Sequence, residues 1–124
     1  MADNKKRLVF MVTQGPENPE LATIPFVMAT TAQASDVDVL MGFQGNGVML
    51  VVKGMADHVW ASGFPPLKDL LNIYTEAGGK LYVCGPCVGS RKIAQPDMVD
   101  GATIVGAATF VAECVAPATN VLVY

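Results

Sequence analysis

With 124 residues, the chain is long enough for one domain with one core, and it contains no repeat or linker, so residues 1–124 are expected to form a single domain. Its net charge of -3 at pH 7 argues against a nucleic-acid surface, which would need a basic face to neutralise phosphates. Hydrophobic residues make up 52% of the chain and charged residues only 15%. A small monomer has little interior for that excess, so the composition predicts a homo-oligomer.

Nothing near the N-terminus has the pattern of a leader or a membrane anchor. Residues 1–4 lack an apolar core, and the apolar run at 8–12 is far too short for a signal sequence or a membrane span. We therefore expect a cytoplasmic protein. In that reducing compartment an odd number of cysteines, 3 in this chain, indicates free thiols rather than a disulfide framework.

The first third of the chain is predicted to form a strand, a helix and a second strand. Residues 8–12 are a continuous apolar run, which is typical of a strand buried on both faces. Apolar residues then recur at helical spacing from the N-cap candidate Asn18 to residue 34, and Pro25 lies early enough to kink this helix without breaking it. Residues 37–43 predict the second strand.

The rest of the chain alternates in the same way. Residues 48–52 fit either a short strand or the start of a helix, because periodicity does not separate the two in so short a run. A helix is expected to open at Pro65-Pro66 and to close at Gly78-Gly79. The elements expected after it are a strand at 81–83, a helix at 88–94, a strand at 102–105, a helix at 107–115 and a strand at 121–124.

This alternation predicts an α/β protein: a three-layer α/β/α sandwich with a mostly parallel sheet of about five strands. Continuous rather than alternating apolar strands require helices on both faces of the sheet. In such sheets the functional crevice lies outside the carboxyl ends of the strands. The segments expected there are 13–16, 44–47, 84–87 and 106–109.

One of these segments, Cys84-Gly85-Pro86-Cys87, carries two thiols between a predicted strand and a predicted helix. A helix N-terminus presents unpaired N–H groups and a partial positive charge, which lower the pKa of a nearby thiol and favour the nucleophilic thiolate. Pro86 suits the first helical position. Cys84 is therefore the candidate reactive thiol, Cys87 is close enough to resolve it as a disulfide, and Cys114 is expected to pack inside a helix.

The motif leaves several kinds of chemistry open. A zinc site needs four ligands; besides the two motif cysteines only His58 and Cys114 remain, and they form no second C-x-x-C or H-x-x-H pair, so no metal is expected. A dithiol oxidoreductase using Cys84 and Cys87 fits the motif but not its late place in the chain. A persulfide carrier needs one exposed thiolate and no cofactor. A module that binds a small ligand beside inert cysteines also remains.

The segments around the predicted strand ends resemble those of a known family along nearly the whole chain. They are Thr13-Gln14-Gly15, Asn18-Pro19-Glu20, Phe43-Gln44-Gly45-Asn46-Gly47-Val48, Lys53-Gly54, Gly63-Phe64-Pro65-Pro66-Leu67 and Leu81-Tyr82-Val83-Cys84-Gly85-Pro86-Cys87 with Arg91-Lys92-Ile93. In these segments the chain resembles the DsrE/DsrF-like family of sulfur-relay proteins, which includes the TusD-type subunits of tRNA-thiolation relays. The resemblance implies an α/β/α sandwich and a trimer or hexamer.

The resemblance also implies a role for Cys84, because the cysteine that directly follows the strand carries sulfur in this family. The chain is thus expected to act as a sulfurtransferase that takes sulfane sulfur from protein donors and passes it to protein acceptors. One departure concerns the helix exit. Many members have Arg-Gly-Ile where this chain has Arg91-Lys92-Ile93, and losing that glycine changes the exit and adds a charge.

The remaining candidate site residues surround this carrier thiol. Backbone N–H groups from Gly85 to Val88 are expected to stabilise the terminal sulfur anion. The segment Thr13-Gln14-Gly15 is expected to line the pocket. Arg91 follows Cys87 by four residues, so both project from one helix face, where the guanidinium can favour a thiolate or an acidic partner.

Overall fold

Five strands form one parallel sheet in the computed structural model, which describes residues 5–124. The strands are β1 (Arg7–Val12), β2 (Asp38–Phe43), β3 (Lys80–Cys84), β4 (Ala102–Val105) and β5 (Thr119–Val123), in the order β4-β3-β2-β1-β5. All four pairings are parallel. Residues 1–4, where the sequence predicts no leader, lie outside the described residues.

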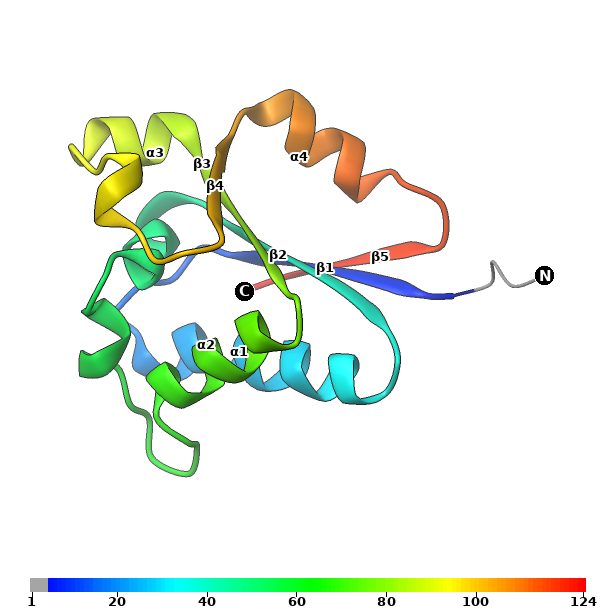
Figure 1. Ribbon diagram of the computed structural model, residues 1–124, viewed down its shortest axis with the longest axis horizontal. Helices are drawn as coiled ribbons and strands as arrows, with labels where there is room; N and C mark the ends of the chain where they lie inside the picture. Colours follow the sequence, from blue (N-terminus) through cyan, green and yellow to red (C-terminus); the bar gives the residue numbers. More distant parts are fainter. Residues whose placement is uncertain (1–4) are drawn as a thin grey trace.

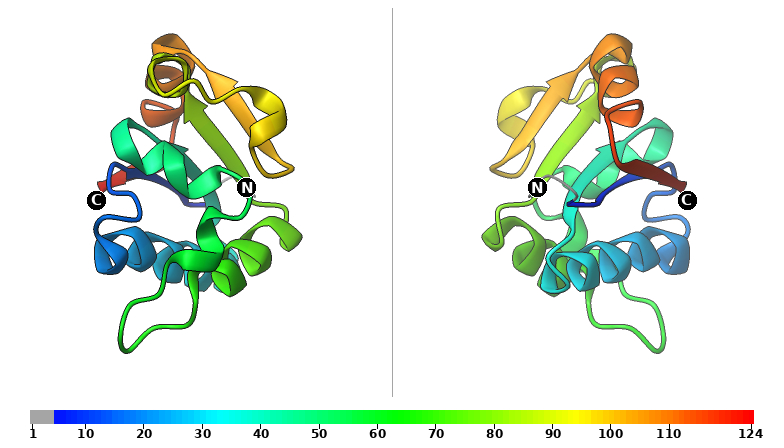
Figure 2. Two further views of the ribbon diagram at one scale, coloured as in Figure 1. Left: turned by 90° about the vertical axis from the view of Figure 1, so that its left-hand side faces the viewer. Right: turned by 90° about the vertical axis from the view of Figure 1, so that its right-hand side faces the viewer.

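Four α-helices connect the strands. They are α1 (Pro19–Ala34), α2 (Leu67–Glu76), α3 (Gly85–Ser90) and α4 (Ala107–Cys114), with three 3₁₀ helices, η1 (Gly45–Val51), η2 (Met55–His58) and η3 (Gln95–Asp97). Helices α1 and α2 cover one face of the sheet and α4 covers the other (Figures 1 and 2). The return from β4 to β5 runs in the opposite direction across the sheet, and a right-handed crossover therefore places α4 on the opposite face. The predicted three-layer sandwich is confirmed.

The core on the α1/α2 side explains why the strand sequences are continuously apolar. Alternate residues of the central strands, such as Phe10, Met41 and Leu81, are buried against these helices. Phe26 of α1 packs against the rings of Phe43 and Tyr74, with ring centroids 5.9 and 6.4 Å apart. The intervening residues pack against α4 on the other face, so neither side of a central strand faces water.

Residues 48–52, for which the sequence left strand and helix open, lie largely in the 3₁₀ helix η1 (Gly45–Val51). Two glycines allow this tight entry. Gly45 has a φ of +53°, and a Cβ on Gly47 would lie 2.2 Å from the carbonyl oxygen of Val12. Helix α1 runs from Pro19 to Ala34 as one element that includes Pro25.

Helix α3 differs from the predicted range of 88–94, because it begins at Gly85 and ends at Ser90. Pro86 is consequently its second residue rather than its first. The early end follows from Lys92, whose φ of 60° is left-handed and stops the helix. The N–H of Ile93 then donates to the carbonyl of Val88 at 2.9 Å, as in a glycine-terminated helix. Helix α3 thus ends in the geometry of a glycine-terminated helix, although Lys92 occupies the position that favours glycine.

Candidate functional site

The two thiols of the motif meet where β3 passes into α3. Cys84 is both the last residue of β3 and the N-cap of α3, and its side chain makes no capping hydrogen bond. Cys87 is the third residue of α3. Both are free and half-buried. Because α3 starts directly after Cys84, one helical turn brings the two thiols close enough for Cys87 to affect the pKa of Cys84.

The electrostatic environment of Cys84 differs from the sequence expectation. Burial raises the pKa of Cys84, and the neighbouring thiol of Cys87 raises it further. The N–H of Cys87 and the charge of Arg91 oppose that shift, but they do not reverse it. Two adjacent thiols do not both ionise easily, since the second negative charge is repelled by the first. Negative charge on Cys87 therefore opposes ionisation of Cys84, which adds to the effect of burial on the pKa of Cys84.

The N–H of Gly45 supplies a hydrogen bond that the sequence did not predict. It donates to Sγ of Cys87, with an N···S distance of 3.2 Å. A hydrogen bond to sulfur favours the charged thiolate over the neutral thiol. The signal in the sequence was the placement of residues 44–47 at the carboxyl edge of the sheet, beside Cys84 to Cys87 on the next strand.

The residues that follow β1 contact two different parts of the molecule. The hydroxyl and the N–H of Thr13 both donate to the carbonyl of Tyr124, at 2.6 and 2.8 Å, so Thr13 is bound to the end of β5 and not to the thiols. Gln14 is half-buried. The N–H of Gly15 donates to a carboxylate oxygen of Glu17 at 3.0 Å. The structure thus brings Gly15, but not the Thr13 hydroxyl, towards the segment that contacts Cys87.

Glu17, which the sequence did not identify, joins the segments that follow β1 and β2. One carboxylate oxygen accepts the Gly15 N–H and the other accepts the side-chain amide of Asn46. The hydrogen bond from Gly15 is the largest cause that lowers the pKa of Glu17, and Asn46 and the charge of Arg91 act in the same direction. Glu17 is therefore a carboxylate at neutral pH. No sequence signal marked it, because its role depends on the close approach of two loops.

The predicted residues of α3 have different surroundings. Val88 is 3% exposed and its side chain belongs to the core, so only its backbone is available to the site. Gly85 lies close to β4, because a Cβ there would be 3.4 Å from the carbonyl oxygen of Val105. Arg91 is exposed and donates to the carbonyl of Cys87 at 3.1 Å. Its charge favours the ionised forms of both Cys84 and Glu17.

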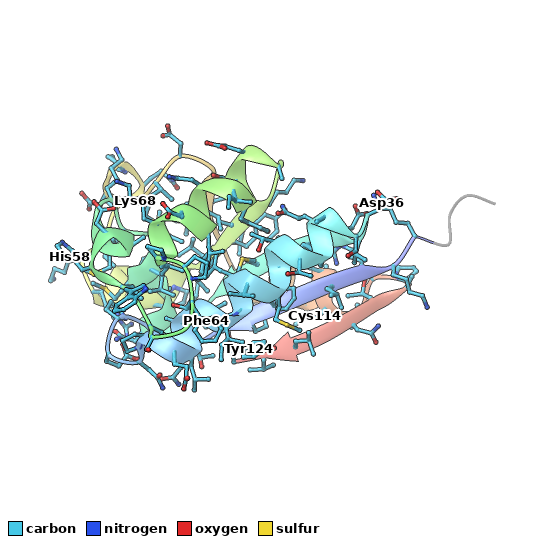
Figure 3. All side chains as sticks on the ribbon, turned by 90° about the horizontal axis from the view of Figure 1, so that it is seen from below. Asp36, His58, Phe64, Lys68, Cys114 and Tyr124 are labelled. Carbon is cyan, nitrogen blue, oxygen red and sulfur yellow. The ribbon has the colours of Figure 1, made fainter. Side chains whose placement is uncertain are left out.

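The third cysteine and the single histidine lie apart from this arrangement. Cys114 packs half-buried beside Phe110 in the cluster under α4, in a groove of about 370 Å³. His58 is exposed at the end of η2, at the end of the molecule opposite Asp36 (Figure 3). Among residues 5–124, no three His, Cys, Asp or Glu side chains are grouped so as to hold a metal ion.

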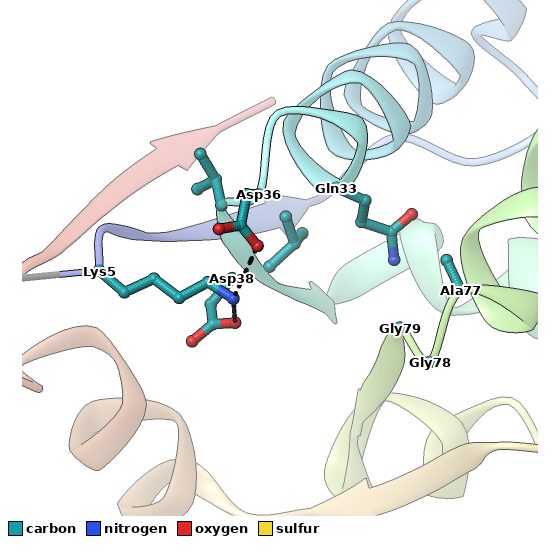
Figure 4. A pocket seen from close by; sticks show the side chains of 9 residues that line it. Lys5, Gln33, Asp36, Asp38, Ala77, Gly78 and Gly79 are labelled. Carbon is teal, nitrogen blue, oxygen red and sulfur yellow. Dashed lines mark ion pairs between the residues drawn. The ribbon is translucent and has the colours of Figure 1, made fainter. Parts of the chain in front are cut away.

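A hollow of about 270 Å³ lies at the amino ends of the strands, away from the thiols (Figure 4). Lys5 forms ion pairs there with Asp36 and Asp38, at 3.3 and 3.1 Å. The amide of Gln33 donates to the carbonyl of Tyr74 at 3.0 Å. None of the predicted site residues lines this hollow. They lie instead at the carboxyl edge of the sheet.

Comparisons with known proteins agree with this fold. Residues 6–122 match the DsrE/DsrF-like family. Two uncharacterised proteins of Methanocaldococcus jannaschii are similar in sequence. MJ0760 is 33% identical over 103 residues, which cover 83% of this chain but only 38% of that protein. MJ0989 is 28% identical over 98 residues, which cover 79% of this chain and 82% of that protein.

Two solved structures share the architecture. The YchN protein of E. coli superposes with a TM-score of 0.79 at 16% identity, over 96% of this chain and 99% of YchN. MTH1491 of Methanobacterium thermoautotrophicum, a protein of unknown function, superposes with a TM-score of 0.71 at 14% identity, over 97% of this chain and 100% of that one. At these identities the likeness shows the fold alone. Within the described residues, every helix is too short or too polar to cross a bilayer.

Proposed function

The chain belongs to the DsrE/DsrF-like family, and we propose that it is a sulfur-transfer protein in which Cys84 accepts a sulfane sulfur and passes it to a partner thiol. The observation that carries this proposal is the pair of free, half-buried thiols at the end of β3, with Cys87 hydrogen-bonded by the N–H of Gly45. Persulfide chemistry needs a thiolate with access to solvent, and the pair provides one with no cofactor.

The proposed reaction is an exchange between thiols and persulfides. Sγ of Cys84 attacks the outer sulfur of a donor persulfide, so that a Cys84 S–S bond forms, the donor S–S bond breaks and the donor leaves as a thiol. Cys87 acts in its thiolate form, to which the N–H of Gly45 donates: it accepts the proton of Cys84 during the attack and passes that proton to the departing donor sulfur. A partner thiolate then attacks the outer sulfur and restores the Cys84 thiol. The charge of Arg91 favours anionic sulfur at Cys84.

The first prediction tests whether Cys84 carries sulfur. Reduced protein incubated with polysulfide is expected to gain the mass of one sulfur atom, because the Cys84 thiolate captures sulfane sulfur. Intact-mass spectrometry measures the gain. Cys84→Ser is expected to lose it, whereas Cys114→Ser, which removes a thiol in the α4 groove, keeps it. A wild-type protein without the adduct, or an adduct that persists in Cys84→Ser, contradicts the proposal.

A dithiol oxidoreductase is the second candidate, favoured by the hydrogen bond from Gly45 to Cys87. That bond favours the Cys87 thiolate, which in dithiol chemistry attacks a mixed disulfide between Cys84 and a substrate, so that the Cys84–Cys87 S–S bond forms, the bond to the substrate breaks and the substrate leaves as a thiol. Cys87→Ser distinguishes the two candidates. Slower but retained sulfur loading supports the carrier, because one thiol is enough to hold a persulfide while Cys87 only accepts its proton, and complete loss of activity supports dithiol chemistry.

The proposed partners follow from the same chemistry. A carrier has no use for sulfur that it does not pass on, so the donors and acceptors are proteins with accessible persulfides or thiols in a reducing cytoplasm. A homo-oligomer of three or six chains is part of the proposal, because apolar side chains of α4 and β5 remain exposed in the single chain.

A further inference from the structure

The N–H of Gly45 donates to Cys87 from a segment that is held by several contacts with its neighbours. Gly45 opens η1, where the first N–H groups of a helix have no partner within it. Its N–H is therefore free to donate to Sγ of Cys87 at 3.2 Å. Its φ of +53° gives the backbone an orientation that few other residues adopt, so the donor direction depends on how the neighbouring residues are held.

Contacts from β1 fix the segment on the side away from the thiols. The N–H of Gln44 donates to the carbonyl of Val12 at 3.0 Å, and the backbone of Gly47 lies against that carbonyl too. A Cβ on Gly15 would lie 2.3 Å from the carbonyl oxygen of Asn46, so these two backbones also touch. The backbone that carries the Gly45 N–H thus packs against the end of β1 and the segment after it.

Glu17 is hydrogen-bonded to both of the segments that meet here, the one after β1 and the one after β2. Its carboxylate accepts the N–H of Gly15 at 3.0 Å and the side-chain amide of Asn46, the residue next to Gly45. Both hydrogen bonds involve a charged acceptor, and such bonds are shorter and stronger than neutral ones. Glu17 is ionised at neutral pH, since these donors lower its pKa. The titratable and charged groups near Cys87 are therefore the Cys84 thiol and Arg91, which contact it, and the Glu17 carboxylate, which is connected to it through Asn46 and Gly45.

We propose that Glu17 and Asn46 are positioning residues: their hydrogen bond holds the Gly45 N–H on Cys87 and so sets the reactivity of that thiol. The inference deepens the proposed function and rests on it for the role of Cys87 as proton acceptor. The contacts themselves do not depend on sulfur transfer. Loss of the Gly45 donor removes a hydrogen bond to the thiolate, and Cys87 becomes harder to ionise.

The direction in which the ionisation of Cys87 changes distinguishes a positioning role of Glu17 from a purely electrostatic one. A carboxylate near a thiolate repels it. If Glu17 acted only through its charge, its removal would therefore make Cys87 easier to ionise. If Glu17 positions the Gly45 N–H, its removal makes Cys87 harder to ionise, because the Gly45 donor is lost. Asn46→Ala changes no charge and isolates the hydrogen bond. The double exchange Glu17→Gln with Asn46→Asp restores both bonds, since a glutamine accepts from Gly15 and donates to an aspartate.

The second prediction uses these variants in the full chain. The rate of alkylation of Cys87 by iodoacetamide is measured against pH and assigned by peptide mass spectrometry. Asn46→Ala and Glu17→Ala are expected to slow Cys87 by about threefold or more near neutral pH, with the limiting alkaline rate unchanged. The double exchange restores the wild-type profile, and Glu20→Ala, which removes an exposed charge from the first turn of α1, leaves it unchanged.

Two results overturn the inference: faster alkylation in Glu17→Ala, or an unchanged profile in Asn46→Ala. Circular dichroism checks the fold of each variant. Asn46→Asp, which keeps the side-chain size but repels Glu17, is expected to slow Cys87 as well and replaces Asn46→Ala if that variant unfolds. Alkylation requires no sulfur donor, so a wild-type protein that fails to load sulfur, but shows these profiles, refutes the proposed function and leaves the positioning role intact.

Discussion

The two thiols of the motif have unequal environments although they are only three residues apart. Cys87 receives the N–H of Gly45 at 3.2 Å, while Cys84 makes no capping hydrogen bond and has a raised pKa because it is buried. In the proposed reaction Cys87 is therefore the proton acceptor, because the N–H of Gly45 donates to its sulfur. A nucleophile at Cys84 then depends on its neighbour, which makes Cys87 more than a resolving thiol in the proposed reaction.

Lys92 provides the third prediction, because it occupies a left-handed position with a φ of 60°. A side chain there crowds the backbone and costs about 1 kcal/mol relative to glycine. Lys92→Gly is expected to raise the free energy of unfolding by about 1 kcal/mol, measured by urea denaturation. Lys68→Gly, the same exchange in helix α2, lowers it or leaves it unchanged. A Lys92→Gly protein that is less stable than wild type contradicts this reading of the helix exit.

The sequence placed the candidate site at the strand ends, and that reasoning depends only on chain order. Cys84 and residues 44–47 were placed at one edge because they follow neighbouring parallel strands, and the Gly45 to Cys87 contact agrees. Glu17 escaped prediction because its partners, Gly15 and Asn46, meet it through side-chain reach and a close backbone approach. The bond from Thr13 to Tyr124 had no signal either, since it requires β5 to lie beside β1.

At the scale of elements, the strands and helices α1, α2 and α4 were predictable, whereas the start of α3 and the 3₁₀ helix η1 were not. Continuous apolar runs marked all five strands, because each central strand is covered on both faces. Helix α3 was placed too late because Gly85 and Pro86 are more typical of turns, whereas the structure uses them as its first two residues. Residues 45–51 form a 3₁₀ helix whose entry depends on contact with β1, which no local pattern records.

The packing of α2 against β3 gives a fourth prediction, through Tyr74. Its hydroxyl donates to the carbonyl of Lys80 at 2.7 Å, and burial raises its pKa well above the usual range. The folded protein therefore resists ionisation of this phenol while the unfolded chain does not. The resulting stability is fully present below the unfolded pKa of about 10 and is lost as pH rises above that value.

Tyr74→Phe is expected to remove this alkaline dependence. Near pH 8 the variant loses about 1 kcal/mol, because the hydrogen bond to Lys80 is gone. At about pH 11 the difference from wild type shrinks or changes sign, since phenylalanine has no proton to lose. Urea denaturation at several pH values measures both, with Tyr82→Phe on a half-buried strand position as the control. Parallel stability curves for wild type and Tyr74→Phe rule out this linkage.

At the scale of the whole molecule, the two faces of the sheet are covered unequally. Helices α1 and α2 enclose the larger core on one side, whereas α4 has only 8 residues and one buried side chain, Phe110. Val111, Val115 and Val123 are 60%, 74% and 68% exposed around the groove that α4 forms with β5. Strand β5 is also at the edge of the sheet, so one side of its backbone has no neighbouring strand among residues 5–124.

The fifth prediction is that this α4/β5 surface is an interface between copies of the chain. Light scattering after size exclusion is expected to give a multiple of 13.0 kDa, because burying these valines removes apolar area from water. Val115→Glu is expected to reduce that mass, since a charge would be buried without a partner. Ile73→Glu, which alters a residue 52% exposed on α2, leaves the assembly intact. A wild-type mass of 13.0 kDa, or dissociation by Ile73→Glu but not by Val115→Glu, excludes this interface.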